Sequence, residues 1–157
     1  MPPPIELTFR SRLRTSADKV WSWVASVEGI SAELRPFFRM TVPPGVRSLA
    51  DVTWRPGQPL FRSRVFLFGL LPIGHSDLTL LELVPGRGFV EQSPMGSMRL
   101  WRHERRIEPV AGANEGVILT DRLTFDPKWA RGLVGWYIEK TFQHRHAVLR
   151  RAFDGDA

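Results

Sequence analysis

The chain contains no cysteine, and this absence removes several functional classes at once. Disulfide scaffolds, thiol nucleophiles and cysteine-ligated zinc are all excluded. The longest apolar run, residues 65–74, falls short of the roughly 20 residues that a membrane-spanning helix needs and is interrupted by Gly and Pro. The amino end, Met-Pro-Pro-Pro-Ile-Glu, lacks the basic patch and apolar stretch of a secretory signal. We therefore expect a soluble, cytoplasmic protein.

Acidic residues are in the minority, with 16 Asp and Glu against 22 Lys and Arg, and the net charge is +6. Most of the excess lies in residues 127–153, which hold six Lys or Arg and one Glu. A basic segment of this kind can make a weak contact with an anionic membrane or an acidic partner. Charges on a helix more often form only a solvated face, so membrane or protein interaction through this segment is kept as an alternative.

The 157 residues, 43% of them hydrophobic and 24% charged, are typical of one globular domain that spans residues 1–157. Residues 5–14 alternate between apolar and polar, which predicts a half-buried strand. Ser16 is placed to cap a helix that ends near Gly29, and residues 31–35 predict one further helical turn before Pro36. Two short helices are therefore expected after the first strand.

The middle of the chain alternates short apolar runs with Pro and Gly turns, which predicts an antiparallel sheet. Its strands are expected at residues 38–42, 51–55, 61–68, 77–84, 88–93, 98–108 and 116–125, the last two joined by a turn that includes residues 112–116. From Pro127 onward, apolar residues at helical spacing predict one long terminal helix of about 26 residues. The fold class is therefore α+β, and a curved sheet closed by a helix leaves room for an internal hydrophobic cavity.

Three charged residues are predicted to point inward from neighbouring strands. The alternation of residues 101–108 turns His103 and Arg105 inward, and that of residues 117–125 turns Asp121 inward. In a hairpin Asp121 faces either His103 or, after a shift of two, Arg105, so either register pairs the carboxylate with a cation. These groups either tether two core strands or orient the polar end of a ligand.

Other inward residues complete the predicted ligand site. Trp101 shares a face with His103, and Glu91 is a candidate for a second acid in the pocket. The full set of predicted ligand-binding residues is Trp101, His103, Arg105, Asp121, Leu119, Leu123, Glu91 and Phe142. The other prominent tryptophans, Trp21, Trp23 and Trp136, are expected to pack in the core.

The sequence gives little support for a metal site, a cofactor site or a nucleic-acid-binding surface. His144 and His146 are two apart on the predicted helix and point about 200° from each other, so no metal site is expected. No cofactor is predicted, because no glycine-rich phosphate loop follows a strand. Glu104 and Glu108 interrupt the arginine-rich outer face of residues 99–106, so nucleic-acid binding is not expected either.

Four stretches carry a resemblance to a known family: residues 89–93, residues 98–105 with their Trp-x-His-x-Arg sequence, residues 120–125, and residues 142–146. The sequence is similar in these stretches to the START-like ligand-binding proteins of the SRPBCC superfamily, in the group often labelled polyketide cyclase or lipid transport. It departs from the family at residues 94–98, where members often place Gly-Pro-Phe. The resemblance implies a helix-grip fold, a curved seven-stranded antiparallel sheet wrapped around the long terminal helix.

The resemblance also implies a function, which is to bind or transport a hydrophobic small molecule such as a lipid, a sterol or an aromatic polyketide. The ligand would lie in a pocket between the sheet and the terminal helix. A minority of the family are enzymes, so cyclase or dehydratase chemistry is an alternative, with His103 as general acid or base and Asp121 orienting it. The fold is thus better determined than the activity.

Overall fold

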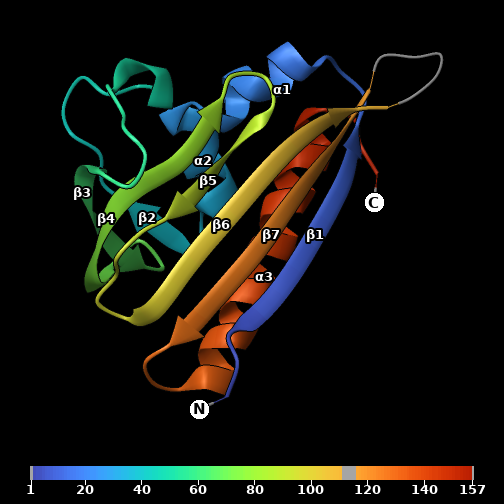
Figure 1. Ribbon diagram of the computed structural model, residues 1–157. Coiled ribbons are helices and arrows are strands. Elements are labelled where there is room, and N and C mark those ends of the chain that lie inside the picture. Colours follow the sequence, from blue (N-terminus) through green and yellow to red (C-terminus); the bar gives the residue numbers. More distant parts are fainter. Residues whose placement is uncertain (1, 111–115, 157) are drawn as a thin grey trace.

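The computed structural model describes residues 2–110 and 116–156 (Figure 1). Its elements, in chain order, are β1 (Ile5–Leu13), α1 (Ala17–Val24), α2 (Val27–Leu34), β2 (Phe38–Met40), the 3-10 helix η1 (Leu49–Asp51), β3 (Pro59–Leu67), β4 (Leu71–Val84), β5 (Gly88–Gln92), β6 (Met98–Pro109), β7 (Val117–Pro127) and α3 (Arg131–Ala152). Within the described residues the strands form one seven-stranded antiparallel sheet in the order β1-β7-β6-β5-β4-β3-β2.

The curved sheet and α3 confirm the predicted α+β helix-grip fold. In Figure 1 the long helix α3 runs behind β1, β7 and β6, while α1 and α2 close the upper part of the fold. Both short helices begin where a serine side chain accepts a backbone N–H: Ser16 from Lys19, and Ser26 from Gly29. The first helix therefore ends at Val24 rather than near Gly29, because the Ser26 cap starts a second helix.

The strand predicted at residues 51–55 is wrong. Ser48 and Asp51 form a capping box in which each side chain accepts a backbone N–H of the other end, and this stabilises η1 up to Asp51. Residues 52–55 form neither helix nor strand. The predicted helix start at Pro127 is also wrong, because Pro127 ends β7 opposite Met98 and α3 begins at Arg131. The predicted turn at residues 112–116 falls largely on residues 111–115, which lie outside the described residues.

The predicted inward faces of β6 and β7 are confirmed. Trp101, His103, Arg105 and Ile107 are buried along β6, and the residues between them are at most half-buried. On β7 the buried row is Val117, Leu119, Asp121, Leu123 and Phe125. This alternation places both apolar and charged side chains on the concave side of the sheet, facing α3.

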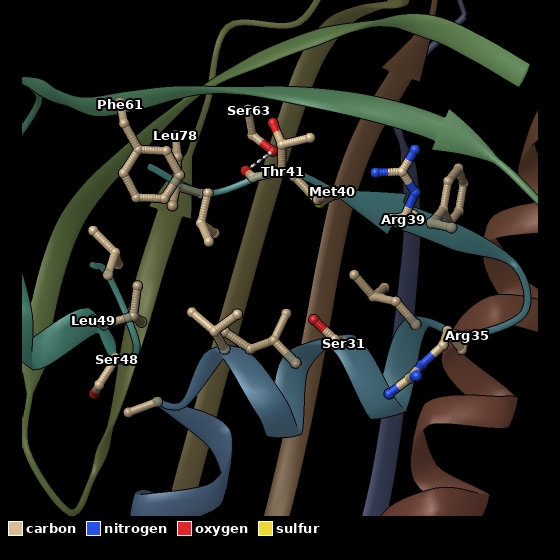
Figure 2. A pocket seen from close by; sticks show the side chains of 17 residues that line it. Ser31, Arg35, Arg39, Met40, Thr41, Ser48, Leu49, Phe61, Ser63 and Leu78 are labelled. Atoms are coloured by element: carbon tan, nitrogen blue, oxygen red, sulfur yellow. Dashed lines mark hydrogen bonds between the residues drawn. The ribbon is translucent and has the colours of Figure 1, made fainter. Parts of the chain in front are cut away.

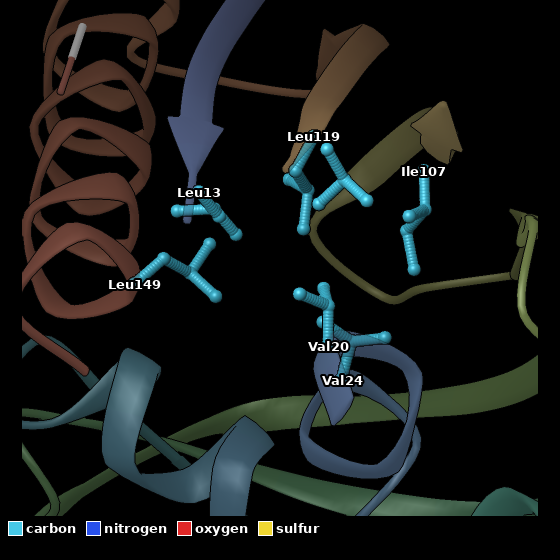
Figure 3. Close-up of a cluster of buried hydrophobic side chains, with 7 residues drawn as sticks. Leu13, Val20, Val24, Ile107, Leu119 and Leu149 are labelled. Atoms are coloured by element: carbon cyan, nitrogen blue, oxygen red, sulfur yellow. The ribbon is translucent and has the colours of Figure 1, made fainter. Parts of the chain in front are cut away.

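Two apolar clusters hold α3 against the sheet. One joins Leu149 of α3 to Leu13, Leu119 and the α1 residues Val20 and Val24 (Figure 3). The other packs Phe142 and Ile138 of α3 with Trp101, Leu123 and Phe125. Trp21 and Trp23 pack against the first cluster, as predicted, but Trp136 is 56% exposed because it lies on the outer side of α3.

In the described part of the chain no helix combines the length and the apolar character needed to cross a membrane.

Candidate functional site

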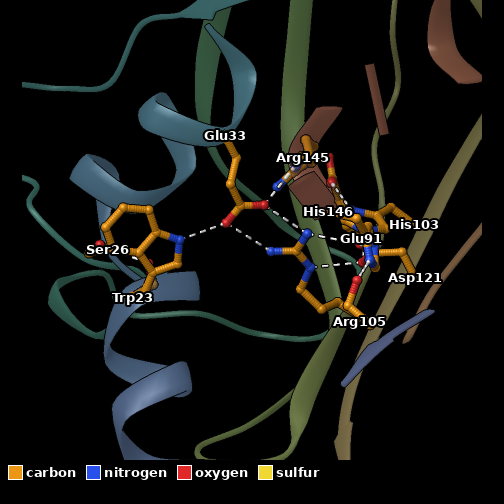
Figure 4. A network of polar contacts seen from close by, with 10 residues as sticks. Trp23, Ser26, Glu33, Glu91, His103, Arg105, Asp121, Arg145 and His146 are labelled. Carbon is orange, nitrogen blue, oxygen red and sulfur yellow. Dashed lines mark hydrogen bonds and ion pairs between the residues drawn. The ribbon is translucent and has the colours of Figure 1, made fainter. Parts of the chain in front are cut away.

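A network of buried charges lies between the sheet, α2 and α3 (Figure 4). At its centre is Arg105, whose side chain is fully buried between two carboxylates. It donates from Nε and Nη2 to the two oxygens of Asp121, at 2.7 and 2.8 Å, and from Nη2 to Glu33 Oε1 at 2.9 Å. The guanidinium therefore links β6 and β7 to α2 by paired, charge-assisted hydrogen bonds.

The pairing of β6 with β7 places Arg105, not His103, directly opposite Asp121. This is the second of the two registers expected from the sequence. His103 lies two residues along β6, and its Nε2 donates to Asp121 Oδ1 at 2.7 Å. Asp121 thus contacts both of the residues that the two registers offered as partners.

Helix α3 completes the network with Arg145 and His146. Arg145 Nε donates to Glu33 Oε1 at 3.0 Å, and His146 Nε2 donates to Asp121 Oδ2 at 2.8 Å. The other ring nitrogen of His146 lies 2.8 Å from Ser11 Oγ on β1. Trp23 of α1 donates its indole N–H to Glu33 Oε2 at 3.0 Å. The network therefore joins three strands and three helices.

Burial and neighbouring charges together set the protonation states of this network. Although burial alone would raise the pKa of Asp121, Arg105 and His103 hold it well below its usual range. The pKa of Glu33 is likewise lowered by Arg105 and Arg145 in spite of burial. Burial lowers the pKa of His103 and outweighs the opposing effect of Asp121.

Acidification is expected to destabilise the protein in two stages. As the pH falls below 6.5, the ordinary pKa of His103, the unfolded chain takes up a proton that the folded chain resists, so the free energy of unfolding decreases. A second loss begins near the ordinary values of Glu33 and Asp121, 4.5 and 3.8, because these groups stay ionised only in the folded state. Each group contributes at most about 1.4 kcal/mol per pH unit.

Urea unfolding measured from pH 7 to pH 3 tests this expectation, with His103→Gln as the comparison. The variant should have a shallower first stage and should retain a second stage, because Arg105 and Arg145 still hold the pKa values of Asp121 and Glu33 down. Equal slopes for the two proteins below pH 6.5 would show that His103 is not held neutral by burial.

A cavity of about 370 Å³ lies beside this network, between α2 and strands β2, β3 and β4 (Figure 2). Its lining is mostly apolar and comes from α2, β2, η1, β3, β4 and the segments next to them. The apolar lining residues are Ala25, Val27, Ile30, Leu34, Phe38, Met40, Val42, Val46, Leu49, Phe61 and Leu78. This size and composition are typical of a site for a small molecule.

The polar part of the lining consists of hydroxyls and arginines. Ser63 Oγ donates to the Thr41 carbonyl at 2.7 Å, so that hydroxyl is already paired. In Figure 2 the Ser31 hydroxyl points from α2 into the cavity. Arg35 and Arg39 are both exposed, and no acidic residue is among the described residues that line this cavity. The lining is therefore apolar with a positive edge.

None of the eight predicted ligand-binding residues lines this cavity. Trp101, Phe142 and Leu123 lie in the core cluster under α3, and Leu119 lies in the other cluster. His103, Arg105 and Asp121 are brought together in the network, with Glu91 Oε1 at 4.0 Å from His103 Nδ1. The space between sheet and α3 is filled by aromatic rings and charged groups, and the cavity borders α2 instead.

Sequence reasoning missed Glu33, Arg145, His146 and Ser11. A signal existed for the two α3 residues, because Phe142, Arg145, His146 and Leu149 recur at the spacing of one helix face. Ser11 also lies on the apolar side of the alternating first strand. Glu33 has no such signal, because its burial depends on how α2 docks on β6 and α3.

The structure is similar to several solved structures over nearly its whole length. The Zhui aromatase/cyclase from a Streptomyces species matches with a TM-score of 0.67 at 12% identity, covering 96% of this chain and 94% of that one. A START superfamily protein from Mycobacterium smegmatis matches with a TM-score of 0.62 at 12% identity, covering 98% of each chain. A protein from Chromobacterium violaceum matches with a TM-score of 0.64 at 15% identity, covering 94% and 98%.

At these identities the similarity establishes the fold and not the activity. A comparison with curated proteins found no match. One family model, described as a domain of unknown function (DUF8410), matches residues 11–153. The chain therefore belongs to the DUF8410 family, and its fold is that of the START-like proteins of the SRPBCC superfamily.

Proposed function

We propose that this protein, as a single domain over residues 1–157, binds an apolar small molecule in the cavity beside α2. The observation that carries the proposal is the cavity itself, about 370 Å³ in volume and lined by eleven apolar side chains. The side chains around a cavity of this size lack packing contacts on one side, so a ligand that fills the cavity would be stabilised by burial of its apolar surface. The START-like fold of the neighbours supports a ligand-binding role.

The chemistry of the lining narrows the ligand class. Ring systems or alkyl chains suit the apolar walls, whereas a polar end suits Ser31 and the exposed arginines at the edge. A lipid, a sterol or an aromatic polyketide would meet this description. Transport of such a molecule, rather than its storage, is a further step of the same proposal.

Cyclase or dehydratase chemistry at His103 and Asp121 gains no support from the geometry, although one neighbour is named an aromatase/cyclase. Both Asp121 oxygens already accept hydrogen bonds from the network. Neither residue is among those that line the cavity. We therefore place binding ahead of catalysis.

Native mass spectrometry of gently purified protein, followed by a thermal-shift screen of fatty acids, sterols and aromatic polyketides, tests this proposal. A ligand at 100 times its dissociation constant should raise the free energy of unfolding by about 2.7 kcal/mol. Ser31→Phe, which places a ring in the cavity, should weaken binding by roughly tenfold or more. The matched control is Ser22→Phe on the exposed side of α1, which should bind as the unaltered protein does.

The proposal fails if no compound class binds at any concentration. It also fails if Ser31→Phe and Ser22→Phe bind a ligand equally well, because the ligand would then lie elsewhere.

A further inference from the structure

Large apolar side chains are exposed at two places that the cavity does not use. One is the tip of the β3–β4 hairpin, and the other comprises the segment just before α3 and the outer side of the first turns of α3. The exposed residues are Phe68 (58%), Leu70 (81%), Leu71 (58%), Ile73 (42%), Trp129 (61%), Leu133 (67%) and Trp136 (56%). We call these seven residues the apolar patch. A group of this kind on a protein surface marks an interaction site.

The two parts of the patch are joined through Tyr137. The ring of Phe68 at the hairpin tip packs edge-on against Tyr137 of α3, with centroids 5.6 Å apart. Leu133 precedes Tyr137 by one helical turn and so lies beside this contact. Trp136 lies on the neighbouring side of the same helix and extends its exposed apolar surface. The hairpin tip and the helix therefore meet at the Phe68–Tyr137 contact.

Most charged groups next to the patch are basic, and the half-buried Glu139, three residues after Trp136, is an acidic one. Arg39 donates from Nε to the carbonyl of Gly69 in the hairpin tip at 3.3 Å. Lys140 lies one turn after Trp136 on the outer side of α3, and Lys128 is the chain neighbour of Trp129. Both lysines are exposed. The nearby acid Asp126 is engaged by Arg131 at 3.1 Å and Arg99 at 3.8 Å.

The C-terminal part of α3 does not provide the uniform basic face that its composition predicts. Arg145 is buried against Glu33, and Arg150 donates to Ser11 Oγ at 2.9 Å. The whole helix therefore does not offer a continuous basic face to an anionic membrane or an acidic partner. The outer side of its first half is apolar instead, which changes both the place and the chemistry of the expected contact.

We propose that the apolar patch and its basic rim dock on the surface of an anionic lipid bilayer. Exposed tryptophan and leucine beside lysine and arginine suit the interface between headgroups and acyl chains, where both kinds of side chain are stabilised. Pairing of two copies through the same patch would bring the basic rims together, so charge favours the bilayer over a second copy. Arg39 belongs to both the rim and the cavity lining, so docking would bring the cavity edge to the lipid surface.

Vesicle flotation tests this proposal without knowledge of the cavity ligand. The full chain is mixed with phosphatidylcholine vesicles and with mixed phosphatidylcholine and phosphatidylglycerol vesicles, at low and at high salt. The test variant is Leu70→Glu with Trp136→Glu. The control is Val84→Glu at the opposite end of β4, roughly 40 Å along the strand from Leu71, where an apolar residue that is 36% exposed also becomes acidic. Circular dichroism checks that each variant is folded.

The unaltered protein and Val84→Glu should bind the anionic vesicles, with binding reduced but not abolished at high salt. The double variant should bind at least about tenfold more weakly, because it replaces inserted apolar groups with acids. Failure of the unaltered protein to bind at low salt, or equal binding by the double variant and the control, would overturn the proposal. So would a dimer of the unaltered protein that the double variant dissociates without any vesicle binding.

Discussion

Replacing Glu33 by glutamine is expected to lower the free energy of unfolding by about 3–5 kcal/mol. The substitution keeps the shape of the side chain but removes the charge that Arg105 and Arg145 share. Arg105 would retain only Asp121, and Arg145 would be buried with no opposing charge among its contacts in the network. A loss of this size is a large fraction of the roughly 5–15 kcal/mol that typically stabilises a domain. Urea unfolding of the variant and of the unaltered protein measures the loss.

The ion pair between Arg106 and Glu82 supplies the matched control. Arg106 follows Arg105 on β6 but points outward, and it pairs with Glu82 at 2.9 Å in contact with solvent. Glu82→Gln makes the same chemical change in an exposed arginine–glutamate pair, and its effect on unfolding should be close to the error of the measurement. If Glu33→Gln and Glu82→Gln cost the same, the buried network does not stabilise the fold as we infer.

Gly88→Ala is expected to cost roughly 3–5 kcal/mol, because it combines backbone strain with overpacking. Gly88 begins β5 with φ at +138°, and a Cβ there would lie 1.9 Å from the carbonyl oxygen of Arg105. That oxygen belongs to the backbone of β6, so it can move only if β5 and β6 separate. The substitution therefore also disturbs the strand that carries the network.

Gly86→Ala separates strain from overpacking. Gly86 has φ at +79°, but its added Cβ would meet nothing closer than Asp18 Oδ1 at 3.9 Å. Only the strain of a left-handed conformation remains, which costs about 1–2 kcal/mol. Thermal unfolding of both variants checks the difference. A smaller loss for Gly88→Ala than for Gly86→Ala would contradict the close approach of β5 to β6.

Most of the sheet could be predicted from the sequence, because two-residue alternation reports burial directly. The inward positions of His103, Arg105 and Asp121 followed from this pattern alone. The exact register did not, since a hairpin with residues 111–115 in its connection admits several pairings. The strand predicted at residues 51–55 is wrong for a different reason, because side-chain hydrogen bonds of Ser48 and Asp51 stabilise a helical turn that ends at Asp51, and residues 52–55 pair with none of the described strands.

The residues that contact the inward charges could not be predicted from local sequence patterns. Glu33 meets Arg105 across 72 residues of sequence, so the contact exists only once α2 has docked on the sheet. The cavity is equally non-local, because its walls come from α2, β2, β3 and β4. Inward-facing residues were predicted to bind the ligand, but in the structure their polar groups bond to one another. A charged residue that points inward can therefore fill the space that a ligand would need.

The interior is thus divided between a charged network that stabilises the fold and a cavity that we propose binds a ligand. The most direct test is the dissociation constant of a ligand from the screen, measured for Ser31→Phe and for His103→Gln. We predict that Ser31→Phe weakens binding by roughly tenfold or more, whereas His103→Gln lowers stability and leaves affinity unchanged. The opposite result, with affinity lost in His103→Gln and retained in Ser31→Phe, would place the ligand against the network and contradict this division.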